Sequence, residues 1–196
     1  MGLTIHYDIS FKGTAKELKK ALNSLGNIAK ELGFAEVQKD VHVINFRDSD
    51  PHTDSDYLQA KDQLEFYLRF FDKAKDIKKC NGITKHIWFG EGCESTCFDL
   101  IREGTKREWT GKGFTKTHYA ENFTKAHISV CALLRAAEKL GFGCKVSDEG
   151  DFYETNDLTR LLDNLQANYA AIATFLKIFV GDNNPAKDEL KKMSLE

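Results

Sequence analysis

The sequence predicts an α+β fold, in which a mixed, largely antiparallel sheet carries helices mainly on one face. An alternation of apolar and polar residues near the start is typical of a half-buried strand, and apolar residues recur at helical spacing in later stretches. Short β-like runs separated by glycines fill the middle of the chain. The 196 residues fit one domain, expected at 1–181, before a polar tail at 182–196 whose last residues resemble a vector-derived end.

Composition argues against several classes of partner. The formal net charge is only -2, so the chain lacks the global field that draws proteins to nucleic acid or to anionic lipid. No stretch approaches the roughly 18–20 uninterrupted apolar residues of a membrane span. The five cysteines are an odd number with no signal segment ahead of them, which indicates reduced thiols. We therefore expect a cytoplasmic protein with no nucleic-acid or membrane partner.

The first β-α-β unit has the clearest local signals. Residues 3–11 alternate between apolar and polar side chains, which predicts a strand with one buried face. Thr14 and Glu17 form a capping-box pattern ahead of apolar residues at helical spacing, and Gly33 marks the end of that helix. Residues 36–47 then predict a second strand.

The middle of the chain has weaker signals for secondary structure. Residues 57–80 fit a helix and a strand equally well, and we favour the helix because Asn81-Gly82 follows two lysines, as at a helix end. Runs at 83–89 and 95–101 around Gly90-Glu91-Gly92 predict a hairpin, and 114–120 predict a further strand.

The last third predicts helix, strand and helix. Asn122 or Thr124 can cap a helix that Gly141 ends, and 144–147 indicate a strand. A turn at 148–150 leads to a last helix that begins near Thr155-Asn156.

Two stretches of sequence resemble each other. His6-Tyr7 precedes a helix ending AKELGF at 29–34, and His118-Tyr119 precedes one ending AEKLGF at 137–142. Either the two β-α-β units are copies of one another, or each Leu-Gly-Phe arose independently, because the end of a helix favours glycine followed by an apolar residue. Copies would form a ferredoxin-like sheet with His6 and His118 side by side on its uncovered face, near Asp8 and Lys116. The other interpretation is that the polar residues of this sheet face are simply exposed to water and form no site.

Three segments carry a family resemblance: GLTIHY at 2–7, the THY and AHI motifs around 117–128, and VSDEGDFYET at 146–155. Together they resemble an uncharacterised bacterial family with an N-terminal GLTIHY-like strand and a C-terminal VSDEG-(Y/F)-(W/Y)-E-T segment. The resemblance covers both ends of the chain and leaves 36–80 without a counterpart. It implies a coherent domain and no particular activity.

VSDEGDFYET gathers carboxylates around Gly150, from Asp148, Glu149 and Glu154, with Tyr153 among them. Crowded carboxylates raise one another's pKa, which suits a general acid, or they hold a hard cation. The structural alternative is a strand-to-helix turn whose acids complement the following helix dipole.

Other motifs are weaker. The alternating DSDPHTDSD at 48–56 lacks the Gly and Glu of a calcium loop, so we expect a hydrated linker. Cys93 and Cys97 miss zinc and redox spacings, and His127 with Cys131 fits helix packing. No nucleotide-binding glycine loop is present. The sequence thus predicts no metal site and specifies no cofactor.

We therefore expect a binding or interaction module for a small molecule or a protein, with self-association through a sheet face or edge. The alternative is a small hydrolase or isomerase that uses acid–base or metal-assisted chemistry on the open sheet face. The candidate catalytic residues are His6, His118, Glu149 and Glu154, and the candidate ligand-binding residues are Asp8, Lys116, Asp148 and Tyr153.

Overall fold

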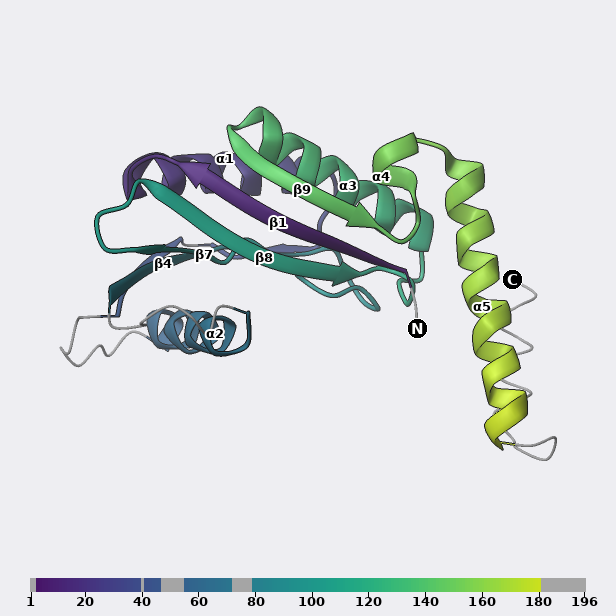
Figure 1. The fold of residues 1–196 in the computed structure, drawn as a ribbon. Helices are drawn as coiled ribbons and strands as arrows, with labels where there is room; N and C mark the ends of the chain where they lie inside the picture. The colour runs from purple at the N-terminus through teal and green to yellow at the C-terminus, as the bar shows by residue number, and fades with distance from the viewer. Residues whose placement is uncertain (1–2, 40, 47–54, 72–78, 181–196) are drawn as a thin grey trace.

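A computed structural model describes residues 3–39, 41–46, 55–71 and 79–180 (Figure 1). A six-stranded sheet has the order β3-β4-β7-β8-β1-β9, and a small sheet has the order β2-β5-β6. The strands are β1 (Thr4–Lys12), β2 (Glu36–Val37), β3 (His42–Asn45), β4 (Cys80–Thr84), β5 (His86–Trp88), β6 (Thr96–Cys97), β7 (Leu100–Glu103), β8 (Glu108–Lys116) and β9 (Phe142–Asp148). The helices are α1 (Ala15–Glu31), α2 (Ser55–Phe71), α3 (Phe123–Lys139), α4 (Phe152–Thr155) and α5 (Leu158–Val180). Paired strands are antiparallel, which confirms the predicted α+β class.

The centre of the large sheet consists of two interlocked split β-α-β units. β8, α3 and β9 form one unit, and β1 lies between its two strands. β1, α1 and β7 form the other, with β8 between β1 and β7 and with β2 to β6 inserted after α1. β1 and β8 are therefore the inner pair of the four strands β7-β8-β1-β9, and they are paired over their full nine-residue length.

Helix α1 begins and ends where its sequence predicts. The Thr14 hydroxyl accepts from the Glu17 N–H at 3.2 Å, and the Glu17 carboxylate accepts from the Thr14 N–H at 2.7 Å, which completes the capping box. Gly33 follows the helix with φ +83°, a left-handed conformation that glycine adopts without a Cβ clash.

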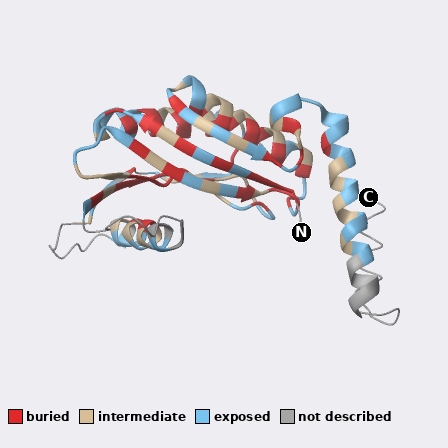
Figure 2. Cartoon of the chain, viewed as in Figure 1, coloured by how far each residue is buried: buried red, intermediate tan, exposed pale blue. Residues whose placement is uncertain are grey.

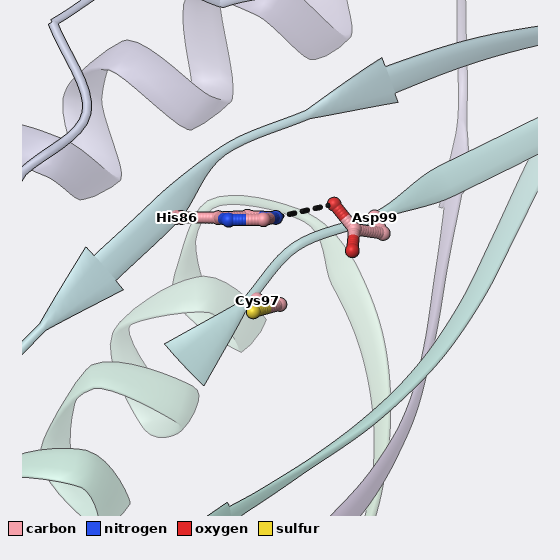
Figure 3. A group of neighbouring side chains, drawn as sticks. All are labelled: His86, Cys97 and Asp99. Atoms are coloured by element: carbon pink, nitrogen blue, oxygen red, sulfur yellow. Dashed lines mark hydrogen bonds and ion pairs between the residues drawn. The ribbon is translucent and has the colours of Figure 1, made fainter. Parts of the chain in front are cut away.

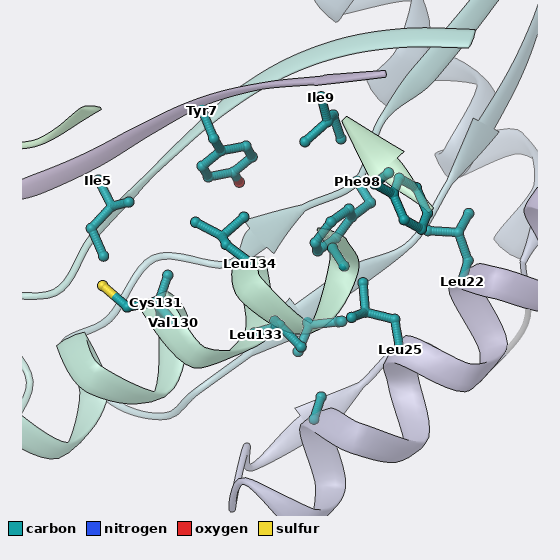
Figure 4. Packing of buried hydrophobic residues seen from close by; sticks show 14 of the residues in the cluster. Ile5, Tyr7, Ile9, Leu22, Leu25, Phe98, Val130, Cys131, Leu133 and Leu134 are labelled. Carbon is teal, nitrogen blue, oxygen red and sulfur yellow. The ribbon is translucent and has the colours of Figure 1, made fainter. Parts of the chain in front are cut away.

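The main core lies between the six-stranded sheet and the helices α1 and α3 (Figures 2 and 4). Odd-numbered residues of β1 point into it, and Tyr7 packs against Phe98 at 6.4 Å between ring centroids. Trp109 of β8 is fully buried and donates from its indole N–H to the Gly13 carbonyl at 3.1 Å. Burial of these large side chains is the main source of stability, since each contributes about 2–3 kcal/mol.

Helix α2 builds a second, smaller core on the opposite side of the sheet. Its Ala60 and Leu64 pack on Ile44, Cys80 and Ile101 of β3, β4 and β7. The helices therefore cover one face along α1 and α3, and the other face only at this end. Within the described residues, the face over β8, β1 and β9 has no element packed on it (Figure 1).

Several predicted boundaries change. Helix α2 at 55–71 covers the start of the ambiguous 57–80 stretch, whose residues 72–78 lie outside the described residues. Residues 48–54 of the acidic segment and the whole of the 182–196 tail also lie outside them. The single strand expected at 36–47 is two strands in two different sheets. The hairpin around Gly90–Gly92 is present as β5-β6, with β4 and β7 flanking it in the large sheet. The strand expected at 114–120 is β8 at 108–116, so His118 and Tyr119 lie in the turn that follows it.

Helix α5 begins at Leu158, after the short unpredicted helix α4, and extends away from the body (Figure 1). Leu161 is buried, but Leu158 and Leu162 stay 43% and 39% exposed. Apolar residues that recur along one face of the helix are therefore only partly covered. None of the described helices is both long and apolar enough to traverse a lipid bilayer.

Candidate functional site

The uncovered sheet face carries side chains in rows that run across three strands. Even-numbered residues of β1 and β8 point to this face, because side chains alternate along a strand and the opposite set is buried. Antiparallel register aligns Lys112, Asp8 and Lys145 in one row and Phe114, His6 and Ser147 in the next. Both rows place a β1 residue between residues of β8 and β9.

The Lys112–Asp8–Lys145 row borders a shallow hollow of about 390 Å³. Small residues leave this space, because Gly143 and Ser10 occupy the neighbouring row. The Lys112 ammonium is 3.4 Å from the Asp8 carboxylate. Two lysines flank one aspartate, so the hollow has a formal charge of about +1 at neutral pH.

The adjoining part of the face combines a histidine, an aromatic ring and a held carboxylate. His6 lies 6.1 Å from Phe114 between ring centroids, and its Nε2 is 3.6 Å from the Glu149 carboxylate. The backbone N–H of Thr4 donates to the other Glu149 oxygen at 2.8 Å, which fixes that carboxylate at the strand end. Lys116 lies over the Phe114 ring at 5.8 Å.

Glu94 completes this end of the face. Its carboxylate accepts from the Lys116 backbone N–H at 3.2 Å and lies 3.9 Å from the Lys116 ammonium. The predicted candidates His6, Asp8, Lys116 and Glu149 therefore share one face.

His118 does not join His6. The β1–β8 register places Phe114 opposite His6, so His118 lies four residues further along the chain and two residues beyond the end of β8. His118 is also buried, and among the described residues neither ring nitrogen has a hydrogen-bond partner. Burial lowers its pKa, which favours the neutral imidazole. The expectation that the two histidines stand side by side is wrong, because the register pairs His6 with Phe114 rather than with His118.

The Asp148 segment forms a buried network on the helix side of the sheet. His127 of α3 lies with Nε2 3.0 Å from Asp148 and Nδ1 2.8 Å from the Thr117 hydroxyl. The backbone N–H groups of Gly150 and Tyr153 donate to the Asp148 carboxylate at 2.7 and 2.9 Å. A buried carboxylate with several donors ties β9, the turn and α3 together.

Two more of the predicted site residues, Glu154 and Tyr153, lie beside this network in positions that fit a strand-to-helix turn. Glu154 is exposed and accepts from the Asp148 backbone N–H at 3.4 Å. Tyr153 packs beside Arg135, whose guanidinium is 5.2 Å from its ring. Asp148 and Tyr153 therefore face α3, and Glu149 is the member of the segment that reaches the open face.

Acid should weaken the fold through Asp148. Burial raises the pKa of Asp148, but His127 and the two backbone N–H donors outweigh that effect and leave its pKa below the usual value. The pKa is lower in the folded state, so the stabilisation is fully present above the unfolded value of about 4 and is lost as pH falls through the folded value. Urea unfolding from pH 7 to pH 3 should show the advantage of wild type over Asp148→Asn shrinking below about pH 4. A constant difference over that range would contradict this assignment.

A second group of polar side chains was missed by sequence reasoning. His86 of β5, Cys97 of β6 and Asp99 converge, and one potential ligand atom from each lies within 4.8 Å of the others (Figure 3). His86 Nε2 is 2.9 Å from an Asp99 oxygen, and the Thr84 hydroxyl donates to the same oxygen. Burial lowers the pKa of His86, but the hydrogen bond to Asp99 and the neighbouring Cys97 raise it by more than burial lowers it. The net result is a pKa of about 10. The hydrogen bond to Asp99 therefore favours the protonated imidazole.

The same chemical set recurs in the interior. His127, Cys131 and Asp148 also have ligand atoms within 4.8 Å of one another. His127 and Cys131 are four residues apart on α3, and that spacing was the signal in the sequence. The described residues thus hold two His/Cys/Asp groups where the sequence predicted no metal site.

Comparison with known proteins supplies no further constraint, because no family model, curated protein or solved structure matches this chain.

Proposed function

We propose that the protein is a binding module whose open sheet face takes a small anionic ligand with a flat or apolar part. The observation that carries the proposal is the pair of adjacent rows on β8, β1 and β9. One row supplies two lysines beside a hollow, and the next supplies the rings of His6 and Phe114.

The charge distribution favours an anion. A carboxylate or phosphate in the hollow would lie between Lys112 and Lys145, which are directly opposite Asp8 on either side. The Lys112–Asp8 contact is exposed, so it stabilises the fold by well under about 1 kcal/mol and an incoming anion can displace it at low cost.

The neighbouring row favours a flat group on the ligand. Phe114 is 39% exposed, although it is large and apolar, and the tilted His6 ring lies beside it. Aromatic rings gain from stacking against flat groups, and such contacts add about 0.5–1.5 kcal/mol to the area they bury. An aromatic carboxylate or a mononucleotide has both features.

Thermal unfolding with added ligand tests the proposal. Probes are inorganic phosphate, benzoate, adenosine monophosphate, a single-stranded oligonucleotide and, as the opposite charge, an alkyl diamine. A bound probe at about 100 times its Kd stabilises the fold by about 2.7 kcal/mol, which is roughly 5–10 °C for a chain of this size. We expect a rise with an aromatic anion, no rise with the diamine, and no preference for the oligonucleotide over the mononucleotide.

Matched variants locate the site. Lys145→Gln and Phe114→Ala should each abolish most of the rise. Lys106→Gln removes the same charge from an exposed pair with Glu103 away from this face, and should keep the rise. His118→Ala should also keep it, because His118 is not on the face. An equal loss in Lys106→Gln and Lys145→Gln, or no rise with any anion, would refute the proposal.

Acid–base catalysis on the same face is a second candidate. It rests on His6 and Glu149, because the Thr4 N–H holds the carboxylate 3.6 Å from the imidazole. A hydrolase or isomerase activity that Glu149→Gln abolishes without loss of anion binding would favour this candidate over a pure binding module.

A further inference from the structure

We propose that His86, Cys97 and Asp99 form a binding site for a transition-metal ion of the zinc class. The three residues come from the β5-β6 hairpin and the segment after it, and they approach one another only because β5 and β6 pair His86 with Cys97. Figure 3 shows the His86 ring directed at the Asp99 carboxylate, with the Cys97 side chain close by.

The donor set suits a borderline-soft divalent ion. Zinc binds a thiolate at about 2.3 Å, an imidazole at about 2.0–2.1 Å and a carboxylate at about 2.0–2.2 Å. Ligand atoms that already lie within 4.8 Å of one another need only small rotations to reach those lengths. Zinc binding would displace the protons of the His86 imidazole and the Cys97 thiol, after which one thiolate and one carboxylate balance a charge of +2.

The surroundings hold two of the ligands in place. The Tyr7 hydroxyl accepts from the Cys97 backbone N–H at 2.9 Å and donates to its carbonyl at 3.3 Å. The Thr84 hydroxyl donates a hydrogen bond to the Asp99 carboxylate and so fixes its orientation. Such outer contacts fix ligand orientation and are typical of metal sites.

Accessibility distinguishes this group from the interior one. The His86 and Asp99 side chains keep 23% and 11% of their surface exposed, whereas those of His127 and Asp148 are fully buried. His127 also has partners at both ring nitrogens, and Asp148 has its backbone donors. An ion could reach His86 from solvent, but it would have to break the interior network to reach His127.

Three protein ligands leave one tetrahedral position open. Structural zinc sites have four protein ligands, whereas three ligands with a water in the fourth position are the arrangement of exchangeable and catalytic sites. We therefore expect a site that exchanges its ion with solution rather than one on which folding depends.

Cobalt titration of the full chain tests the site. Cobalt(II) bound to a thiolate gives a near-ultraviolet charge-transfer band, and zinc should displace it. We expect one equivalent to bind and the band to disappear in Cys97→Ser, with zinc affinity, measured by competition with a chromophoric chelator, falling at least about tenfold in Cys97→Ser and Asp99→Asn. Circular dichroism checks that each variant is folded.

Other thiols provide the controls. Cys144→Ser changes a half-buried thiol outside both groups and should keep the band. Cys131→Ser should also keep it, because the interior group does not take up the ion. Failure of wild type to bind either ion, persistence of the band in folded Cys97→Ser, or its loss in Cys131→Ser would each overturn the proposal. These outcomes are independent of anion binding on the open face.

Discussion

Replacement of Asp148 by alanine should lower the free energy of unfolding by about 3–5 kcal/mol. The carboxylate is buried and accepts from His127 and from the backbone N–H groups of Gly150 and Tyr153. Its removal leaves those donors without a partner in the interior, and each unsatisfied group costs about 1–3 kcal/mol. Chemical denaturation at pH 7 measures the loss directly.

Asp8→Ala is the matched control. It removes the same side chain from an exposed contact with Lys112 on the same sheet, and should change stability by less than about 1 kcal/mol. A loss below about 1 kcal/mol in Asp148→Ala would mean that the network does not hold β9, the turn and α3 together.

Local signals predicted the elements that depend on nearby residues. The β1 alternation, the Thr14 capping box and the Gly33 stop each act within a few positions, and all three are present in the structure. Shifted elements had conflicting local signals. Gly111 and Gly113 interrupt the apolar alternation of β8. The strand was therefore predicted at 114–120, although it begins at Glu108.

The sites depend on pairings that local pattern does not encode. His86 and Cys97 meet through the hairpin register, and their spacing in the chain matches no metal motif. His6 and Glu149 meet because β9, which is far from β1 in the sequence, pairs with it in the sheet. The carboxylate segment was singled out from the sequence, but only the strand-to-helix geometry shows that Asp148 turns inward while Glu149 turns outward.

Strand β1 connects the two proposed sites. His6 and Asp8 point to the open face, whereas Tyr7 between them points inward and holds the Cys97 backbone. Because side chains alternate along a strand, consecutive residues of β1 would serve the proposed anion site on one side and the proposed metal site on the other. A shift of β1 by one residue would disrupt both.

Gly92→Ala should lower the free energy of unfolding by about 3 kcal/mol, the sum of a strained backbone and a steric clash. Gly92 has φ +73°, and an added Cβ would lie 1.9 Å from the Tyr119 carbonyl oxygen and 2.9 Å from the Ala120 Cα. The loop and the turn before α3 would therefore have to separate. Thermal or urea unfolding measures the effect.

Gly104→Ala separates the two contributions. Gly104 has φ +57°, and an added Cβ would meet nothing within 4 Å, so its substitution adds only the backbone strain of about 1 kcal/mol. The excess loss in Gly92→Ala then measures the contact between the loop and Tyr119. That loop continues into Glu94, whose carboxylate holds Lys116 on the open face, so anion binding should weaken in Gly92→Ala and not in Gly104→Ala. Equal destabilisation of the two variants would show that the loop does not press on the turn.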